Sequence, residues 1–191
     1  MGQFNRRAAL RTATAWGATA LALASPLAAR AQAGGAGRIE ERLRQLGITL
    51  PASGPAPVAN YVPTLRHHNT VYVAGQIPFK APGELLHRGR VGAELTLEQG
   101  RASARLVGIN MLALLKRELG DLDRVAGVLR IDGFVSSAND FTQQPQVMNG
   151  ISDLMVEVFG DAGRHTRTAV GVNVLPLNAP CEINAEFSLR A

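Results

Sequence analysis

Two short runs of alternating residues at the C-terminal end of the chain constrain the fold most strongly. In residues 181–189 the side chains alternate strictly between apolar and polar, from Cys181 to Leu189, and in residues 170–174 three valines share one parity. A period of two is the pattern of strands that have one buried face. The Pro-bounded segment 176–180 separates the two runs, so the sequence predicts a β-hairpin.

Two charged side chains, Arg167 and Glu182, fall on the faces opposite these apolar rows. Charges on a sheet face indicate a ligand-binding role. If the hairpin pairs symmetrically about its turn, Glu182 lies opposite Val174, and Arg167 is then seven residues away along the strand, roughly 23 Å. One flat hairpin cannot bring the two side chains to one small ligand. The spacing therefore predicts that a second subunit, or strong curling of the sheet, brings them together.

The first 33 residues have the composition of an export signal. The basic segment 5–11 contains the pair Arg6-Arg7, an uncharged Ala-rich run follows from 12 to 29, and Ala31 and Ala33 fit an A-x-A cleavage site. Paired arginines before a mildly apolar run resemble a twin-arginine signal, which predicts export to the periplasm. An ordinary secretory signal and an uncleaved anchor are the alternatives. No later run approaches the roughly 20 apolar residues that a membrane span needs, so we expect no membrane contact after cleavage.

Removing this segment changes the charge of the protein. Its only charged residues are four arginines, so the formal net charge falls from +5 for the whole chain to +1 for the remaining 158 residues. A nucleic-acid-binding domain needs a basic surface of its own, so we expect no nucleic-acid partner. The single cysteine, Cys181, excludes an intramolecular disulfide, and its apolar parity predicts a packed, inert thiol.

Helix and strand patterns alternate through the rest of the chain. Residues 34–57 contain a short helical repeat at 39–46 and then a linker rich in proline, and residues 58–191 form a single domain. Thr96 and Gln99 have the form of a capping box. The order β-β-β-α-β-α-β-β predicts an α+β domain, in which a six-stranded mixed sheet has both long helices on one face and the 39–46 helix as an appendage. The expected elements are strands 61–65, 70–74, 85–91 and 125–135, helices 96–119 and 145–159, and the closing hairpin.

The uncovered face of this sheet needs a partner. On the predicted parity it carries the small residues Ala169 and Gly171 among few polar groups. A bare face of this kind favours packing against another subunit. His165 shares the parity of Arg167, and we expect it at the surface.

Several short motifs occur together in an order that is typical of one family. They are Asn60-Tyr61-Val62, Val73-Ala74-Gly75-Gln76-Ile77-Pro78, Asn149 early in the second helix, Arg167, Leu175-Pro176 and Glu182-Ile183. Together they resemble the reactive-intermediate deaminase family, also called the RidA or YjgF family, over roughly residues 57–191. The segments 163–167 and 175–178 are similar to a subgroup that is often labelled chorismate-mutase-like from shape alone.

This resemblance implies a homotrimer of chorismate-mutase-like fold, with ligand clefts between subunits and with neither a metal nor an organic cofactor. It also implies hydrolysis of enamine or imine products of amino-acid dehydratases, such as 2-aminoacrylate, to 2-keto acids and ammonia. The partner is then a small carboxylate-bearing metabolite. Arg167 would hold the carboxylate as a bidentate fork, and Glu182 would orient the attacking water as a general base. The other implied substrate-binding positions are Tyr61, Ala74, Gly75 and Asn149.

Some positions depart from the family pattern. Ala74 stands where relatives often carry serine, Ala169 where they often carry cysteine, and His165 in place of a common proline. A non-catalytic trimer that binds a small carboxylate in the same cleft is therefore an alternative function. A ribonuclease or translation inhibitor is a weaker alternative, because the near-neutral mature charge and the lack of an aromatic–basic stacking surface disfavour it.

Overall fold

The structure is a computed structural model that describes residues 37–52 and 60–190. The predicted export signal lies outside the described residues. Among these residues, no helix is long and apolar enough to cross a membrane. The helices are α1 (Arg38–Gln45), α2 (Leu97–Leu119) and α3 (Gln144–Phe159), and the strands are β1 (Thr64–His67), β2 (Thr70–Gln76), β3 (Phe79–Ala81), β4 (Glu84–Leu85), β5 (Val125–Ser136), β6 (Thr166–Val172) and β7 (Cys181–Leu189).

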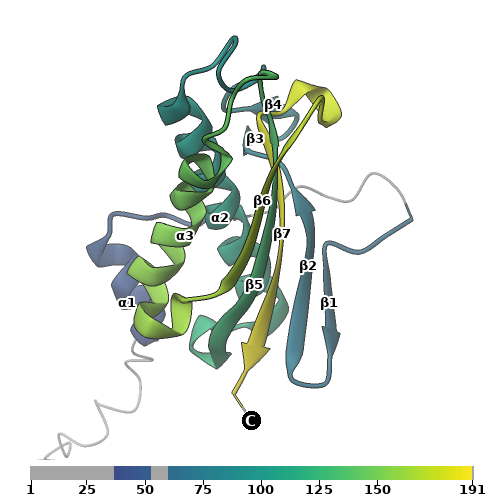
Figure 1. The fold of residues 1–191 in the computed structure, drawn as a ribbon. Coiled ribbons are helices and arrows are strands. Elements are labelled where there is room, and N and C mark those ends of the chain that lie inside the picture. Colours follow the sequence, from purple (N-terminus) through teal and green to yellow (C-terminus); the bar gives the residue numbers. More distant parts are fainter. Residues whose placement is uncertain (1–36, 53–59, 191) are drawn as a thin grey trace, which may run out of the picture. The chain divides into compact units, whose positions relative to one another are not determined.

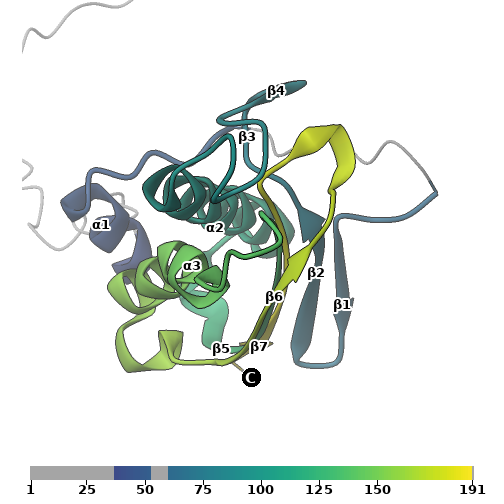
Figure 2. The ribbon, with the colours of Figure 1, turned by 45° about the horizontal axis from the view of Figure 1, so that its top comes forward.

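A mixed sheet with α2 and α3 on one face forms the body of the domain (Figures 1 and 2). Its strands have the order β1-β2-β7-β5-β6. β5 and β6 are parallel, and the other neighbouring strands are antiparallel. We call the face opposite α2 and α3 the open face. The predicted α+β class, with two helices on one face of a mixed sheet, is confirmed.

The number of strands in the main sheet differs from the prediction. The sheet has five strands, while β3 and β4 form a separate two-stranded pair. The expected strand 85–91 is absent from the described structure, where Val91 forms only isolated bridges. The backbone explains this, because Gly83, Gly89 and Gly92 all have positive φ values and so turn the chain where a strand would have to continue.

The predicted hairpin of the two C-terminal runs is wrong. β7 lies between β2 and β5, and β6 is a parallel edge strand beside β5. β5, α3 and β6 follow one another as a strand–helix–strand unit, and such a crossover returns the chain to the same end of the sheet. The connection between Pro176 and Pro180 then takes the chain across β5, so that β7 pairs with β5 on the side opposite β6. Glu182 therefore pairs with Phe134 of β5 and not with Val174.

The faces of β6 are the reverse of those predicted. Val170 lies on the open face, whereas Ala169 and Gly171 lie on the helix face. α3 packs so closely here that a Cβ at Gly133, the β5 partner of Ala169, would lie 2.2 Å from the Met148 side chain. Small residues on the helix face thus make room for α3, and apolar side chains remain on the open face.

The alternation predicted for β7 is confirmed. All its apolar positions are buried, from Cys181 to Leu189, and the polar positions between them are partly exposed. Burial raises the pKa of the Cys181 thiol to about 12, as expected for a packed thiol that does not react as a thiolate.

The two long helices begin and end where the sequence predicts. The Thr96 hydroxyl accepts a hydrogen bond from the Gln99 amide at 3.2 Å, and the Gln99 side chain accepts one from the Thr96 amide at 2.9 Å. Gly120 and Gly160 end the two helices. The α3 residues expected to face inward are all buried: Val147, Ile151, Leu154, Met155 and Val158.

The short helix α1 belongs to the core of the domain. Ile39 and Leu43 are buried in the same hydrophobic cluster as the sheet, and Glu40 pairs with Lys116 of α2. The Asp123 carboxylate accepts hydrogen bonds from the first amides of α1, where acidic groups stabilise a helix. The interpretation of this helix as an appendage is therefore corrected.

Candidate functional site

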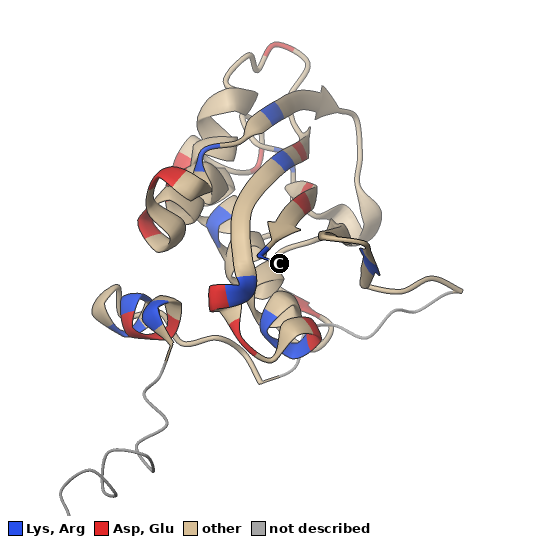
Figure 3. Ribbon diagram, turned by 90° about the horizontal axis from the view of Figure 1, so that it is seen from below, with Lys and Arg blue, Asp and Glu red and all other residues tan. Residues whose placement is uncertain are grey.

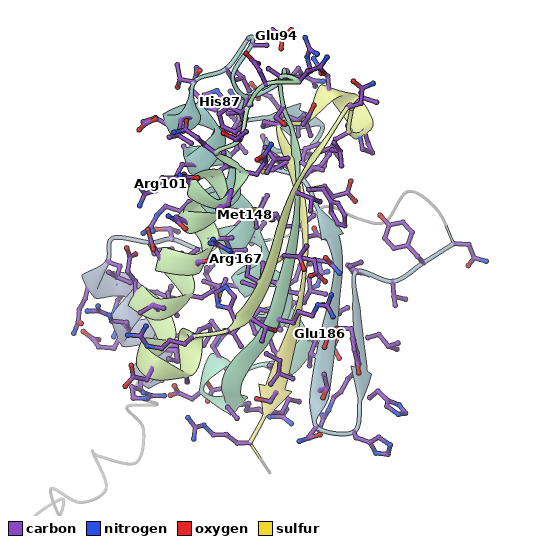
Figure 4. All side chains as sticks on the ribbon, viewed as in Figure 1. His87, Glu94, Arg101, Met148, Arg167 and Glu186 are labelled. Atoms are coloured by element: carbon purple, nitrogen blue, oxygen red, sulfur yellow. The ribbon has the colours of Figure 1, made fainter. Side chains whose placement is uncertain are left out.

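The edge strand β6 and helix α3 together hold the side chain of Arg167. Its Nη1 donates hydrogen bonds to Asn149 Oδ1 at 2.9 Å and to Ser152 Oγ at 3.0 Å. Asn149 and Ser152 are three residues apart and so lie on one face of α3. Figure 4 shows Arg167 between β6 and α3, whereas Glu186 lies on the other side of the sheet. The structure thus brings two predicted site residues, Arg167 and Asn149, together.

His165 lies behind this contact and fixes the Ser152 hydroxyl. Its Nδ1 is 2.7 Å from the Gly163 carbonyl, and its Nε2 is 3.1 Å from Ser152 Oγ. A carbonyl only accepts, so Nδ1 carries the proton and Nε2 of the neutral ring accepts from Ser152. Burial, and secondarily the positive charge of Arg167, lower the pKa of His165, against the opposing effect of the Gly163 carbonyl. The expected surface position of His165 is corrected, because this ring is partly buried.

These contacts determine which edge of the guanidinium is free. Both hydrogens of Nη1 are used by Asn149 and Ser152. Among the described residues, no hydrogen bond is made by Nε or Nη2 of Arg167. The N–H groups of these two atoms point in parallel from one edge of the planar group, and this edge fits a carboxylate in bidentate form.

A second polar group lies on the open face, where β2 meets β7. The β2–β7 register shifts between Val73 and Gln76, and the bulge places Gly75 against Glu182. A Cβ at Gly75 would lie 2.3 Å from Glu182 Oε1. The Gln76 side chain donates to the carbonyls of Ala74 and Gly75 at 3.1 and 3.0 Å. The predicted residues Ala74, Gly75 and Glu182 are therefore brought together.

The carboxyl group of Glu182 is half-buried at this bulge. Burial raises its pKa above the ordinary value. The charged form is penalised there because the group has lost part of its water. A carboxylate with a raised pKa is a better proton acceptor, which is the property that a general base needs.

The two polar groups do not meet within one chain. Arg167 pairs with Ile131 of β5, and Glu182 pairs with Phe134. Because Ile131 and Phe134 are three residues apart, the two charged side chains lie on opposite faces of the sheet. Their Cα atoms are separated by roughly 10 Å along the strands and roughly 10 Å across them. A small ligand cannot contact both side chains of the same chain.

The remaining predicted residue, Tyr61, stands apart from both groups in the described contacts. It lies in the segment before β1, is 49% exposed, and makes no hydrogen bond to another described residue. Sequence reasoning missed Ser152. Its spacing of three from Asn149 on a predicted helix was the available signal.

We expect the Gly75→Ala substitution to reduce a Glu182-dependent activity while leaving the fold intact. The new methyl group would displace the Glu182 carboxylate, which is the mobile end of a flexible side chain. The unfolding temperature should change little, and kcat should fall by about tenfold to a hundredfold, as for a displaced general base. Thermal unfolding and steady-state kinetics on the same preparation measure both effects. An unchanged kcat would show that the carboxylate position is unimportant.

No group of three or more side chains suited to hold a metal ion occurs in the part of the chain that the structure describes. The two polar groups carry a guanidinium, a carboxylate, an amide and a hydroxyl–imidazole pair.

Comparison with known proteins shows which family and which solved structures this chain is similar to. Residues 40–187 match the family described as YjgF/chorismate mutase-like, a description that also carries an endoribonuclease label. Protein TCP17 of Trypanosoma cruzi is 42% identical over 155 residues, which cover 81% of this chain and 96% of that protein. A solved structure of a protein of unknown function from Agrobacterium tumefaciens is 40% identical, with a TM-score of 0.73 over 80% of this chain and 92% of that one. A Shewanella oneidensis structure with the same endoribonuclease label is 34% identical, with a TM-score of 0.75 over 79% and 99% of the two chains.

The structure defines an α+β protein with one polar group at the β6 edge of its sheet and another on the open face. The extent of the match and the identity to TCP17 are decisive for its relationship. The chain belongs to the YjgF family, which includes the Rid proteins.

Proposed function

We propose that this protein is an enamine/imine deaminase whose active site is completed between two subunits of a homotrimer. The arrangement of Arg167 and Glu182 carries the proposal. Each side chain is prepared for one part of the reaction, but the two lie on opposite faces of the sheet. The β6 edge of one subunit would then lie against the open face of the next.

The proposed reaction is the hydrolysis of a 2-imino acid, formed directly or from its 2-enamino tautomer. The free edge of Arg167 binds the substrate carboxylate and fixes the neighbouring imine carbon. Glu182 of the adjacent subunit accepts a proton from water, whose oxygen bonds to that carbon. The carbon–nitrogen bond then breaks, and the nitrogen leaves as ammonia with both protons of the water. The product is the 2-keto acid.

The apolar side chains of the open face support the subunit contact. Four large ones are exposed by 39–57% and form two pairs, one on β1 and β2 and one on β5 and β6, with the polar positions of β7 between them. Large apolar side chains exposed on one face of a sheet favour an interaction surface there, and a second copy of the chain in cyclic symmetry is a common way to cover such a face. These residues are Leu65 of β1, Tyr72 of β2, Phe134 of β5 and Val170 of β6.

Charge distribution favours this proposal over the endoribonuclease label of the relatives. Figure 3 shows basic and acidic segments interspersed, with no basic face in this view. Arg101 and Arg105 of α2 pair with Asp153 and Glu157 of α3. Nucleic-acid binding requires basic residues that are clustered and free for phosphates. We therefore propose a small carboxylate, and not a nucleic acid, as the ligand.

We also propose that the N-terminal segment directs export of the protein.

The test is to generate 2-aminoacrylate with a serine dehydratase and to follow pyruvate release with and without the chain that begins after residue 33. We expect clear acceleration over spontaneous hydrolysis. If release is not accelerated but pyruvate still binds, the protein is the non-catalytic carboxylate-binding trimer. If neither is observed, the proposed site is wrong.

The pH dependence should report Glu182. Because burial raises the pKa of Glu182 above its ordinary value, kcat/KM should fall as the pH decreases through this raised pKa and the base becomes protonated. Glu182→Gln should reduce kcat by about a hundredfold or more and abolish this acid limb of the pH profile.

The stability of the fold should depend on pH in the opposite direction from kcat/KM. A carboxyl with a raised folded pKa stabilises the fold below the unfolded pKa and loses this contribution as the pH rises, so the Gln variant should be the more heat-stable at neutral pH.

A further inference from the structure

We propose that Ser152 and His165 are positioning residues of the Arg167 carboxylate site, which direct the free edge of the guanidinium toward the ligand. The inference rests on the proposed function, because it takes Arg167 as the carboxylate-binding group. Neither side chain is a partner of Glu182, and both act through Arg167. The three residues form one chain of hydrogen bonds, from the Gly163 carbonyl through His165 and Ser152 to Arg167 Nη1.

The direction of each hydrogen bond in this chain is fixed. The Gly163 carbonyl sets the tautomer of His165, and the unprotonated Nε2 gives the Ser152 hydroxyl proton an acceptor. The lone pairs of Ser152 Oγ are then free to accept from Arg167. Without this acceptor, a helical serine tends to donate to the carbonyl four residues earlier in its own helix, and its lone pairs would turn away from the guanidinium.

Holding Nη1 in place fixes the orientation of the guanidinium before a ligand binds. Arg167 is largely exposed, and an exposed arginine side chain has many rotamers to lose on binding. Asn149 and Ser152 hold Nη1 from two directions, so the plane of the group is fixed before a ligand arrives. Such preorganisation increases affinity without adding a contact to the ligand.

Pyruvate binding to the assembled protein, measured by titration calorimetry, tests the inference independently of turnover. At about pH 8, Ser152→Ala and His165→Ala should each weaken binding by about threefold to tenfold, the effect of one lost hydrogen bond. His165→Gln should restore the wild-type affinity, because its side-chain oxygen can accept from Ser152.

His68→Asn is the matched control, since His68 is an exposed turn residue with a φ of 51° that asparagine tolerates. It should bind as wild type. Equal affinity of wild type and both alanine variants, or failure of His165→Gln to restore binding, would each overturn the inference. If the protein turns over 2-aminoacrylate but shows none of these effects, the positioning inference is wrong and the deaminase proposal is unaffected.

Discussion

Replacing Arg167 with lysine is expected to abolish most of the proposed deaminase activity while leaving the fold unchanged. The ammonium group keeps the charge but cannot bond to Asn149 and Ser152 and also offer two parallel N–H groups to a carboxylate. We expect kcat/KM to fall by at least about a hundredfold, as for loss of a bidentate, charge-assisted contact in the transition state. Pyruvate affinity should fall with it.

Arg164→Lys is the control for this substitution. Arg164 lies three residues away, is exposed, and makes an ion pair with Asp161. Exposed ion pairs contribute little to stability, so this variant should have wild-type kinetics and unfolding temperature. If Arg167→Lys also keeps its activity and its affinity for pyruvate, Arg167 is a structural residue and the proposed site fails.

The second large effect is expected from Gly150→Ala in α3. A Cβ at Gly150 would lie 2.1 Å from the Arg101 carbonyl oxygen and 3.1 Å from the Arg105 amide nitrogen of α2. These are backbone atoms, so the two helices would have to move apart. Overpacking of this kind destabilises by about 3 kcal/mol, which outweighs the gain of about 1 kcal/mol from replacing glycine in a helix.

Denaturant unfolding monitored by circular dichroism measures this loss. Gly127→Ala is the control, because a Cβ there would meet its nearest atoms at 3.4 and 3.5 Å, which are ordinary contact distances. The control should unfold close to wild type, and Gly150→Ala should unfold at much lower denaturant or fail to accumulate in soluble form. Wild-type stability of Gly150→Ala would mean that α2 and α3 do not approach as closely as described.

Local chemistry made the helices and the central strand predictable from sequence. The capping pair Thr96 and Gln99 and the glycines at 120 and 160 act within a few residues of themselves, so they determine helix ends without reference to the fold. The alternation of β7 likewise predicts a strand whichever strands lie beside it. Strand pairing is different, because alternation indicates a buried face but does not indicate which strand lies beside it. The 16-residue helix between β5 and β6 was the better guide, since it predicts a parallel pair.

Misplacing β6 also reversed the interpretation of its residues. Ala169 and Gly171 are small because α3 covers them, and not because another subunit does. Arg167, Asn149, Gly75 and Glu182 were each singled out from sequence, but the contacts of Arg167 with Asn149 and of Gly75 with Glu182 were not predicted. The spacing of Ser152 from Asn149 could have added the serine to this group, but its contact with His165 depends on how the end of α3 returns to β6, which the sequence does not show.

The central claim is that Arg167 of one subunit and Glu182 of another act on one ligand. Mixing the two inactive variants, Arg167→Lys and Glu182→Gln, by joint refolding or co-expression tests it directly. In mixed cyclic oligomers, about one quarter of the sites combine an intact arginine with an intact glutamate, so pyruvate release from 2-aminoacrylate should recover to about one quarter of the wild-type rate. A mixture that stays as inactive as its parents, despite verified subunit exchange, would contradict the shared site.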